Sequence, residues 1–168
     1  MNLYEGIQTR RSIRQYENRP VEKEIIAKLL KAGMQAPSAA NQQPWEFIVV
    51  EDKETLIKLA NAHMYATPMK NAPLGIIVLL NAKYLIADKY WQQDLSAATE
   101  NILLAAVELG LGAVWLGLAP AAERMSYIRE LFKLPPGVEA FSMLAIGYSP
   151  ANKFVDRFDS SRIHYEKY

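Results

Sequence analysis

The sequence predicts a layered fold of the α+β or α/β type, in which helices cover a central β-sheet. Hydrophobic residues make up 51% of the 168-residue chain and charged residues 22%, a composition typical of globular proteins. Amphipathic helical patterns alternate with short apolar runs of strand length. The sequence contains no internal repeat and no polar linker, which predicts one domain over residues 1–168.

The first half of the chain predicts two helices, a strand and a third helix. A short helix is expected to end near Thr9, and an amphipathic helix is expected over residues 21–34. A loop with two prolines, residues 36–44, precedes a β-branched and aromatic strand at residues 45–50. The apolar spacing after this strand predicts a helix over residues 54–63.

The second half alternates predicted strands and helices. An apolar strand at residues 74–80 precedes a long helix at residues 91–109, which Gly110 and Gly112 are expected to end. The apolar face of this helix is wide, as in a helix buried within a domain or against a second subunit. The remaining predicted elements are a strand at residues 113–117, a helix at residues 121–132 and a strand at residues 140–147.

Composition argues against several classes of function. The absence of cysteine excludes thiolate zinc sites, iron–sulfur clusters and cysteine nucleophiles, and two histidines do not suffice for a multi-histidine metal site. A formal net charge of +1 gives no global attraction for nucleic acid or an anionic membrane. The sequence shows neither a secretory signal nor an apolar run long enough for a spanning helix, so a cytoplasmic protein is expected.

Residues 10–14, with the sequence R-R-S-I-R, are a candidate anion site. Guanidinium groups pair bidentately with phosphate oxygens, and the Ser12 hydroxyl adds a donor without charge. A solvated basic turn is the alternative interpretation. Neither G-x-G-x-x-G after a strand nor G-x-x-x-x-G-K-[ST] occurs, so side chains would have to bind any phosphate.

Two further segments are candidate ligand contacts. The amides of Asn41 and Gln43 match the alternating donors and acceptors of a uracil-like ring, although loop residues of this kind also satisfy turn backbone. Gly117 would allow backbone N–H groups to approach a ligand closely, or simply end a strand. Ser38 and His164 do not form a convincing nucleophile and base, because no nucleophile elbow surrounds the serine.

The chain after Pro150 is charged and aromatic and has no helical period. Such tails either fray or contact a neighbouring molecule, and the large apolar residues favour contact. These residues are Phe154, Phe158, Ile163, Tyr165 and Tyr168.

The order of the segments resembles a known family. R-R-S-I-R at residues 10–14 is followed by P-S-A-A-N-Q-Q-P-W at residues 37–45, G-L-G-A-V-W-L-G at residues 110–117 and A-I-G-Y-S-P at residues 145–150. This arrangement is similar to the short-chain form of the nitroreductase family of FMN-dependent oxidoreductases. The resemblance extends from Tyr4 into the C-terminal tail.

The resemblance implies an α+β fold with a central, mostly antiparallel sheet flanked by helices. It also implies a homodimer that exchanges its C-terminal extensions and carries two shared FMN sites at the interface. The FMN phosphate and ribityl chain would contact Arg10, Ser12 and Arg14, with Arg11 close by.

The same resemblance assigns the other cofactor contacts. From the opposite subunit, one loop would pack on the flavin with Pro37, Ser38 and Ala39 and bring Asn41 and Gln43 to the same face. Leu116 and Gly117 would present backbone at flavin N5, and the tail would add basic phosphate contacts from Lys153 and Arg157. Residues 63–69 show no clear match to a further polar contact of the family.

The function implied is reduction of nitroaromatic, quinone or similar acceptors by NAD(P)H through a ping-pong flavin mechanism, with no catalytic side chain and no metal. Reductive dehalogenation and flavin breakdown, which relatives of the family perform, are alternatives. A flavin-storage protein without turnover and a phosphate-binding module without flavin are two more.

Overall fold

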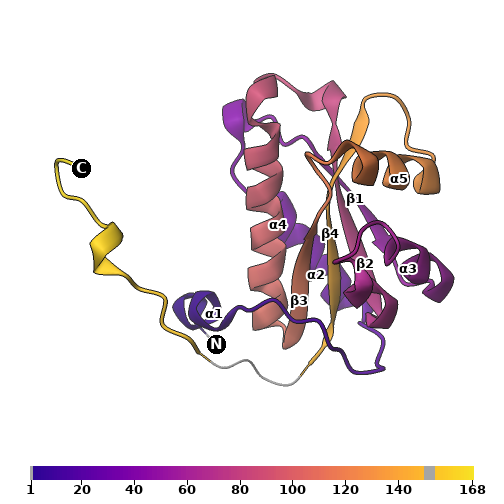
Figure 1. The fold of residues 1–168 in the computed structure, drawn as a ribbon, viewed down its shortest axis with the longest axis horizontal. Coiled ribbons are helices and arrows are strands. Elements are labelled where there is room, and N and C mark those ends of the chain that lie inside the picture. The colour runs from indigo at the N-terminus through magenta and orange to yellow at the C-terminus, as the bar shows by residue number, and fades with distance from the viewer. Residues whose placement is uncertain (1, 150–153) are drawn as a thin grey trace.

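The computed structural model describes residues 2–149 and 154–168. Within these residues, four strands form one antiparallel sheet in the order β1-β2-β4-β3 (Figure 1). The strands are β1 (Trp45–Val50), β2 (Leu74–Asn81), β3 (Leu111–Gly117) and β4 (Val138–Tyr148). The predicted α+β class and the antiparallel pairing implied by the resemblance are confirmed.

Helices cover both faces of the sheet. One face packs against α2 (Lys23–Met34) and α4 (Trp91–Glu108), and the other packs against α3 (Lys53–Leu59) and α5 (Ala122–Phe132). The short helix α1 (Leu3–Thr9) contacts α4. Successive side chains of a strand point to opposite faces. Ile76 and Val78 of β2 therefore belong to the core beneath α4, whereas Ile77 and Leu79 belong to the core beneath α3 and α5.

Several predicted boundaries differ from the structure, including that of β4, which spans residues 138–148 rather than 140–147. The differences at α2, α3 and the junction of α4 with β3 have local reasons. α2 begins at Lys23 rather than residue 21, with Glu22 as its N-cap. α3 ends at Leu59 rather than residue 63, because the next residues form tight turns with bonds from residue i to residue i−3. Gly110 alone ends α4, with a φ of 74°, whereas Gly112 lies within β3, which begins two residues earlier than predicted.

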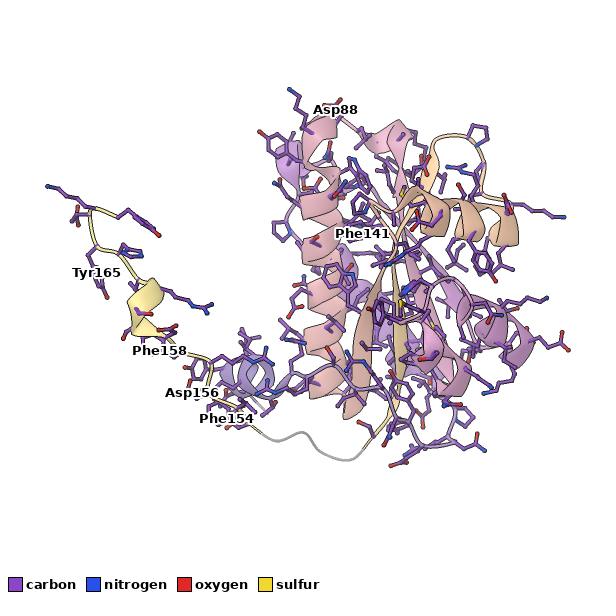
Figure 2. The ribbon with its side chains drawn as sticks, in the orientation of Figure 1. Asp88, Phe141, Phe154, Asp156, Phe158 and Tyr165 are labelled. Carbon is purple, nitrogen blue, oxygen red and sulfur yellow. The ribbon has the colours of Figure 1, made fainter. Side chains whose placement is uncertain are left out.

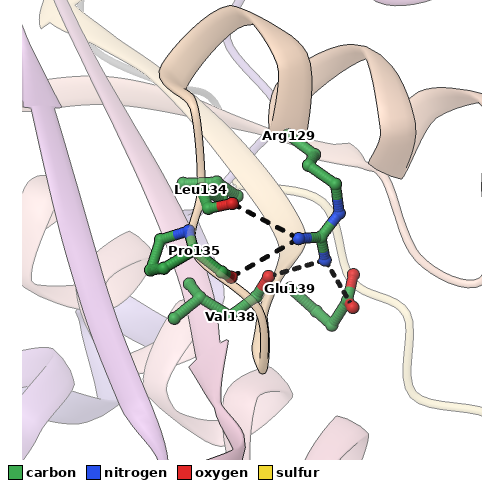
Figure 3. Close-up of polar contacts among 5 residues, drawn as sticks. All are labelled: Arg129, Leu134, Pro135, Val138 and Glu139. Carbon is green, nitrogen blue, oxygen red and sulfur yellow. Dashed lines mark hydrogen bonds and ion pairs between the residues drawn. The ribbon is translucent and has the colours of Figure 1, made fainter.

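Arg129 fixes the connection from α5 to β4 (Figure 3). Its guanidinium donates to the backbone oxygens of Leu134 and Pro135 at 3.4 Å each and to that of Val138 at 2.8 Å. The same group pairs with the Glu139 carboxylate at 2.5 Å. Arg129 thus uses its N–H groups on its own chain, as a structural arginine does.

Two glycines allow the N-terminal segment to lie directly on the sheet. Gly112 of β3 and Gly147 of β4 are partners in the antiparallel register. A Cβ on Gly112 would lie 2.6 Å from Cγ2 of Ile13, and a Cβ on Gly147 would lie 2.6 Å from Cδ of Pro73. These distances are shorter than real carbon contacts, so a side chain on Gly112 would displace Ile13 of the crossing segment, and one on Gly147 would displace Pro73. A Cβ on Gly147 would also lie 3.0 Å from the Cβ of Tyr16 in the crossing segment.

Backbone bonds fix this crossing. Ile13 donates its N–H to the oxygen of Ala113 at 2.9 Å, and Ser12 forms an isolated parallel bridge with Ala113. The Tyr16 hydroxyl lies within hydrogen-bond distance of the oxygens of Ile13 and Ala145, at 2.6 and 2.9 Å. Burial raises the pKa of Tyr16, so the hydroxyl keeps its proton as a donor. Residues 12–16 are thus attached to the two strands that lead to the site.

We expect Gly112→Ala to destabilise the protein by about 1–3 kcal/mol, because its Cβ would push Ile13 away from β3. Urea unfolding measures the difference. The control is Gly6→Ala in α1, where a Cβ meets nothing within 4 Å and the gain in helix propensity is up to about 1 kcal/mol. Unchanged stability in Gly112→Ala would contradict the close-packing argument.

Candidate functional site

A cavity of about 360 Å³ lies at the C-terminal end of β3. Its volume is within the range of small-molecule sites, which starts at roughly 300 Å³. The cavity is formed by three parts of the chain that are distant in sequence. Its lining residues are Arg14, His63, Met64, Tyr65, Thr67, Pro68, Val114, Trp115, Leu116, Gly117 and Arg124.

The crossing of the N-terminal segment brings Arg14 to this cavity. The bond from Ile13 to Ala113 ties the residue before Arg14 to the edge strand β3. Arg14 is exposed and donates from Nη1 to the Ser12 oxygen at 3.3 Å, while Ser12 itself is also exposed. Arg14 and Ser12 are therefore close together and accessible to a ligand.

The end of β3 offers open backbone on the cavity. Leu116 and Gly117 both line it, and a Cβ placed on Gly117 would meet no atom within 4 Å. The Gly117 oxygen accepts a hydrogen bond from Nη1 of Arg124 at 3.0 Å. A flat ligand thus has room to approach the Gly117 backbone.

His63 presents an unsatisfied donor in the lining. Its Nδ1 accepts from the Tyr65 N–H at 3.3 Å, whereas its Nε2 is buried and has no partner within the described part of the chain. Burial, and then the charge of Arg124, lowers the pKa of His63. With Nδ1 occupied as an acceptor, the neutral ring carries its proton on Nε2.

The charged side chains that line the cavity are all positive. Arg14 and Arg124 contribute two permanent positive charges, and among the described lining residues none is Asp or Glu. The nearest carboxylate to Arg124 is that of Glu123, at 3.9 Å, and its side chain is 78% exposed. The arrangement suits an anionic ligand or one rich in hydrogen-bond acceptors.

The loop at residues 37–43 is rigid but does not line this cavity. The Asp94 carboxylate accepts from the Ala39 N–H at 2.8 Å and from the Gln42 amide at 2.6 Å, which fixes the loop to the start of α4. The Ser38 hydroxyl accepts from the Gln43 N–H at 3.0 Å, and Gln43 donates to the Asn41 amide oxygen at 3.0 Å. The non-glycine φ angles of 50°, 53° and 45° at residues 40, 41 and 43 mark a strained loop.

Comparison with known proteins identifies the family. A model of the nitroreductase family matches residues 7–85 and 62–148. The chain belongs to the nitroreductase family.

Individual nitroreductase relatives are similar over nearly their whole length. A protein of Methanothermobacter thermautotrophicus, provisionally named NADH dehydrogenase/NAD(P)H nitroreductase, is 46% identical over 100% of this chain and 88% of its own. A crystal structure from Clostridium acetobutylicum, provisionally named NADH oxidase, is 52% identical with a TM-score of 0.95 and covers 97% of this chain and 99% of its own. A structure from Desulfovibrio desulfuricans, provisionally named a nitroreductase and in complex with FMN, is 31% identical with a TM-score of 0.85, over 99% and 97% of the two chains.

Arg10 and Arg11 have partners away from the cavity. Arg10 Nε pairs with the Glu100 carboxylate of α4 at 3.2 Å. Burial raises the pKa of Glu100, although the charge of Arg10 acts in the opposite direction. Arg11 donates to the oxygens of Arg10 and Val155 at 2.6 and 3.1 Å. Within one chain, Arg14, Leu116 and Gly117 therefore meet in the cavity, and the other predicted cofactor residues that the structure describes do not line it.

The predicted tail contacts lie outside the cavity or outside the described residues. Lys153 is not among the residues that the structure describes. Arg157 is exposed in the tail. Phe158 and Tyr165 of the same tail lie far from the sheet (Figure 2). Their roles stay predictions, as do those of residues 37–43.

Most lining residues of the cavity were not predicted as site residues, among them the polar side chains of His63, Thr67 and Arg124. No motif marks them. His63 and Thr67 lie within residues 63–69, where the family resemblance gives no clear match to a further polar contact, and Arg124 lies in α5. Among residues 2–149 and 154–168, no helix has the length and apolar character to cross a membrane.

Proposed function

We propose that residues 1–168 form an FMN-binding domain that oxidises NADH or NADPH and reduces nitroaromatic, quinone or related acceptors. The observation that carries this proposal is the cationic cavity at the end of β3, which has open backbone at Gly117 and no carboxylate among its described lining residues. The family, and the FMN complex of the Desulfovibrio relative, support FMN as the ligand.

The residues present fit FMN by their chemistry. A phosphate and a ribityl chain require positive charge and hydroxyl or amide donors; Arg14, which lines the cavity, would supply the charge, and the exposed Ser12 hydroxyl two residues earlier would add a donor. A planar ring requires an open surface, and the absence of any atom within 4 Å of a Cβ at Gly117 provides it. His63 Nε2–H is a further donor for an acceptor-rich ring edge.

Bound FMN would supply the hydride chemistry, which explains why the site requires no side-chain acid or base. The chain's own task is to bind the phosphate, orient the ring against the end of β3 and limit access. Met64 and Tyr65, which are 77% and 65% exposed, lie at this cavity and restrict the approach. Donor and acceptor would enter in turn by the same route, and alternate occupancy predicts ping-pong kinetics.

We further propose that two copies of the chain share each site. The loop at residues 37–43 does not line the cavity of its own chain, so it is available to a second copy. The tail exposes Phe154, Phe158 and Tyr165 by 54%, 76% and 82%. An apolar groove of about 420 Å³ between α1, α2 and α4 would give such side chains a surface to cover. Lys153 and Arg157 would reach the phosphate from this tail.

We expect Arg14→Ala to weaken FMN binding by about 1.5–3 kcal/mol, because it removes a charge-assisted contact to the phosphate. Titration of the apoprotein with FMN, followed by flavin fluorescence, measures this. Lys28→Ala is the matched control, since it removes a positive charge from an exposed position of α2. Equal FMN affinity in all three proteins would reject the assignment of Arg14.

The shared site predicts a dimer in solution. Sedimentation equilibrium of the flavin-loaded protein is expected to give twice 19.0 kDa. A stable monomer that retains FMN would contradict the shared site while leaving the cofactor assignment intact.

A further inference from the structure

We propose that Arg124 sets the reduction potential of the bound flavin by stabilising the negative charge of its reduced ring. This inference rests on the proposed function, since it assumes FMN in the cavity at the end of β3. It assigns to Arg124 a role separate from that of Arg14, which binds the phosphate and ribityl side in both oxidation states.

The position of Arg124 in α5 is not explained by helix stability. Arg124 is the third residue of α5, where the helix dipole favours acidic rather than basic side chains. Its only ion pair among the described residues is the 3.9 Å contact with Glu123, whose exposed carboxylate is screened by water. The positive charge of Arg124 is therefore only weakly neutralised by its neighbours and acts on the cavity.

Arg129, on the same helix, is an arginine whose guanidinium is used for structural contacts, and it provides a comparison for Arg124. Arg129 donates to three backbone oxygens and pairs with Glu139 at 2.5 Å. Among the described residues Arg124 makes one hydrogen bond, to the Gly117 oxygen at 3.0 Å, and it lines the cavity. A guanidinium has five N–H donors, so Arg124 keeps donors for a ligand.

The contact with Gly117 places the charge at the reacting end of the cavity. Gly117 provides the open backbone against which the ring is proposed to lie, and the Arg124 guanidinium is hydrogen-bonded to that residue. Arg14, His63 and Tyr65 are the charged and titratable groups that line the cavity with Arg124, and Glu123 is its ion-pair partner. Of these, only the exposed Glu123 carries a negative charge, so the field on the ring is positive.

Reduction of the ring adds negative charge within this positive field. The oxidised ring takes up two electrons and one proton, which leaves one negative charge on the reduced ring. A fixed positive charge nearby favours the reduced state over the neutral oxidised state. Arg124 therefore increases the affinity of the protein for reduced FMN more than for oxidised FMN, which raises the reduction potential.

The test compares the wild-type protein with Arg124→Gln and Arg124→Lys, each loaded with FMN. The potential is measured anaerobically against a reference dye while xanthine and xanthine oxidase supply electrons, and the affinity for oxidised FMN is measured separately. Gln is polar and uncharged, so this variant removes the positive charge and keeps an amide donor in the side chain. Lys133→Gln is the control, since it removes an exposed charge at the end of α5, outside the cavity.

We expect Arg124→Gln to lower the preference for reduced over oxidised FMN by about tenfold, which is about 30 mV for a two-electron couple. Arg124→Lys should restore most of this shift, and Lys133→Gln should leave the potential unchanged. An unchanged potential in Arg124→Gln would overturn the inference. Loss of oxidised FMN from Arg124→Gln would also overturn it, because Arg124 would then be a general binding residue. Failure of the wild-type protein to bind FMN would instead reject the proposed function.

Discussion

The close approach of residues 12–16 to the sheet is the constraint on which the site depends. It depends on Gly112 and Gly147 at the point of crossing, where a Cβ on Gly112 would lie 2.6 Å from Ile13 and a Cβ on Gly147 would lie 3.0 Å from the Cβ of Tyr16. The crossing carries the chain past the edge strand β3 and brings Arg14 to the same end of β3 as Gly117. The two glycines therefore connect the packing of the fold to the chemistry of the cavity.

The cavity combines rigid positions with permanent charge. Its wall at β3 belongs to the central sheet, and Arg129 and its four partners fix the connection that follows α5 (Figure 3). Arg14 and Arg124 supply two guanidinium groups, and burial lowers the pKa of His63, which favours its neutral ring. A site of this kind requires no proton transfer by a side chain and can leave the chemistry to a cofactor.

Much of the fold could be predicted from the sequence, because its helices and strands have distinct apolar spacing. Strand direction could not be read from residues, since an apolar run such as that at residues 74–80 is compatible with either direction, and it came from the family resemblance. The role of Gly112 was misread because a glycine that follows a helix also fits a position of close packing within a strand. The order of elements was correct, whereas the boundaries depended on such local contacts.

The site was predictable only in part. A run of adjacent arginines predicts a common anion site, but Arg10 and Arg11 have partners on α4 and in the tail, and Arg14 alone lines the cavity. Arg124 was missed because an arginine on an amphipathic helix has the same pattern as a solvated charge. His63 was missed because its environment is created by turns after α3 that apolar spacing does not encode.

The visible absorption spectrum of the purified protein, recorded before and after anaerobic addition of NADH or NADPH, tests the central claim most directly. The account predicts a bound-flavin spectrum that is bleached by at least one of the two nicotinamides. A flavin spectrum that neither nicotinamide bleaches would indicate a flavin-binding protein without this activity. A colourless protein that does not bind added FMN would contradict the account, and the charges of Arg14 and Arg124 would then require another ligand.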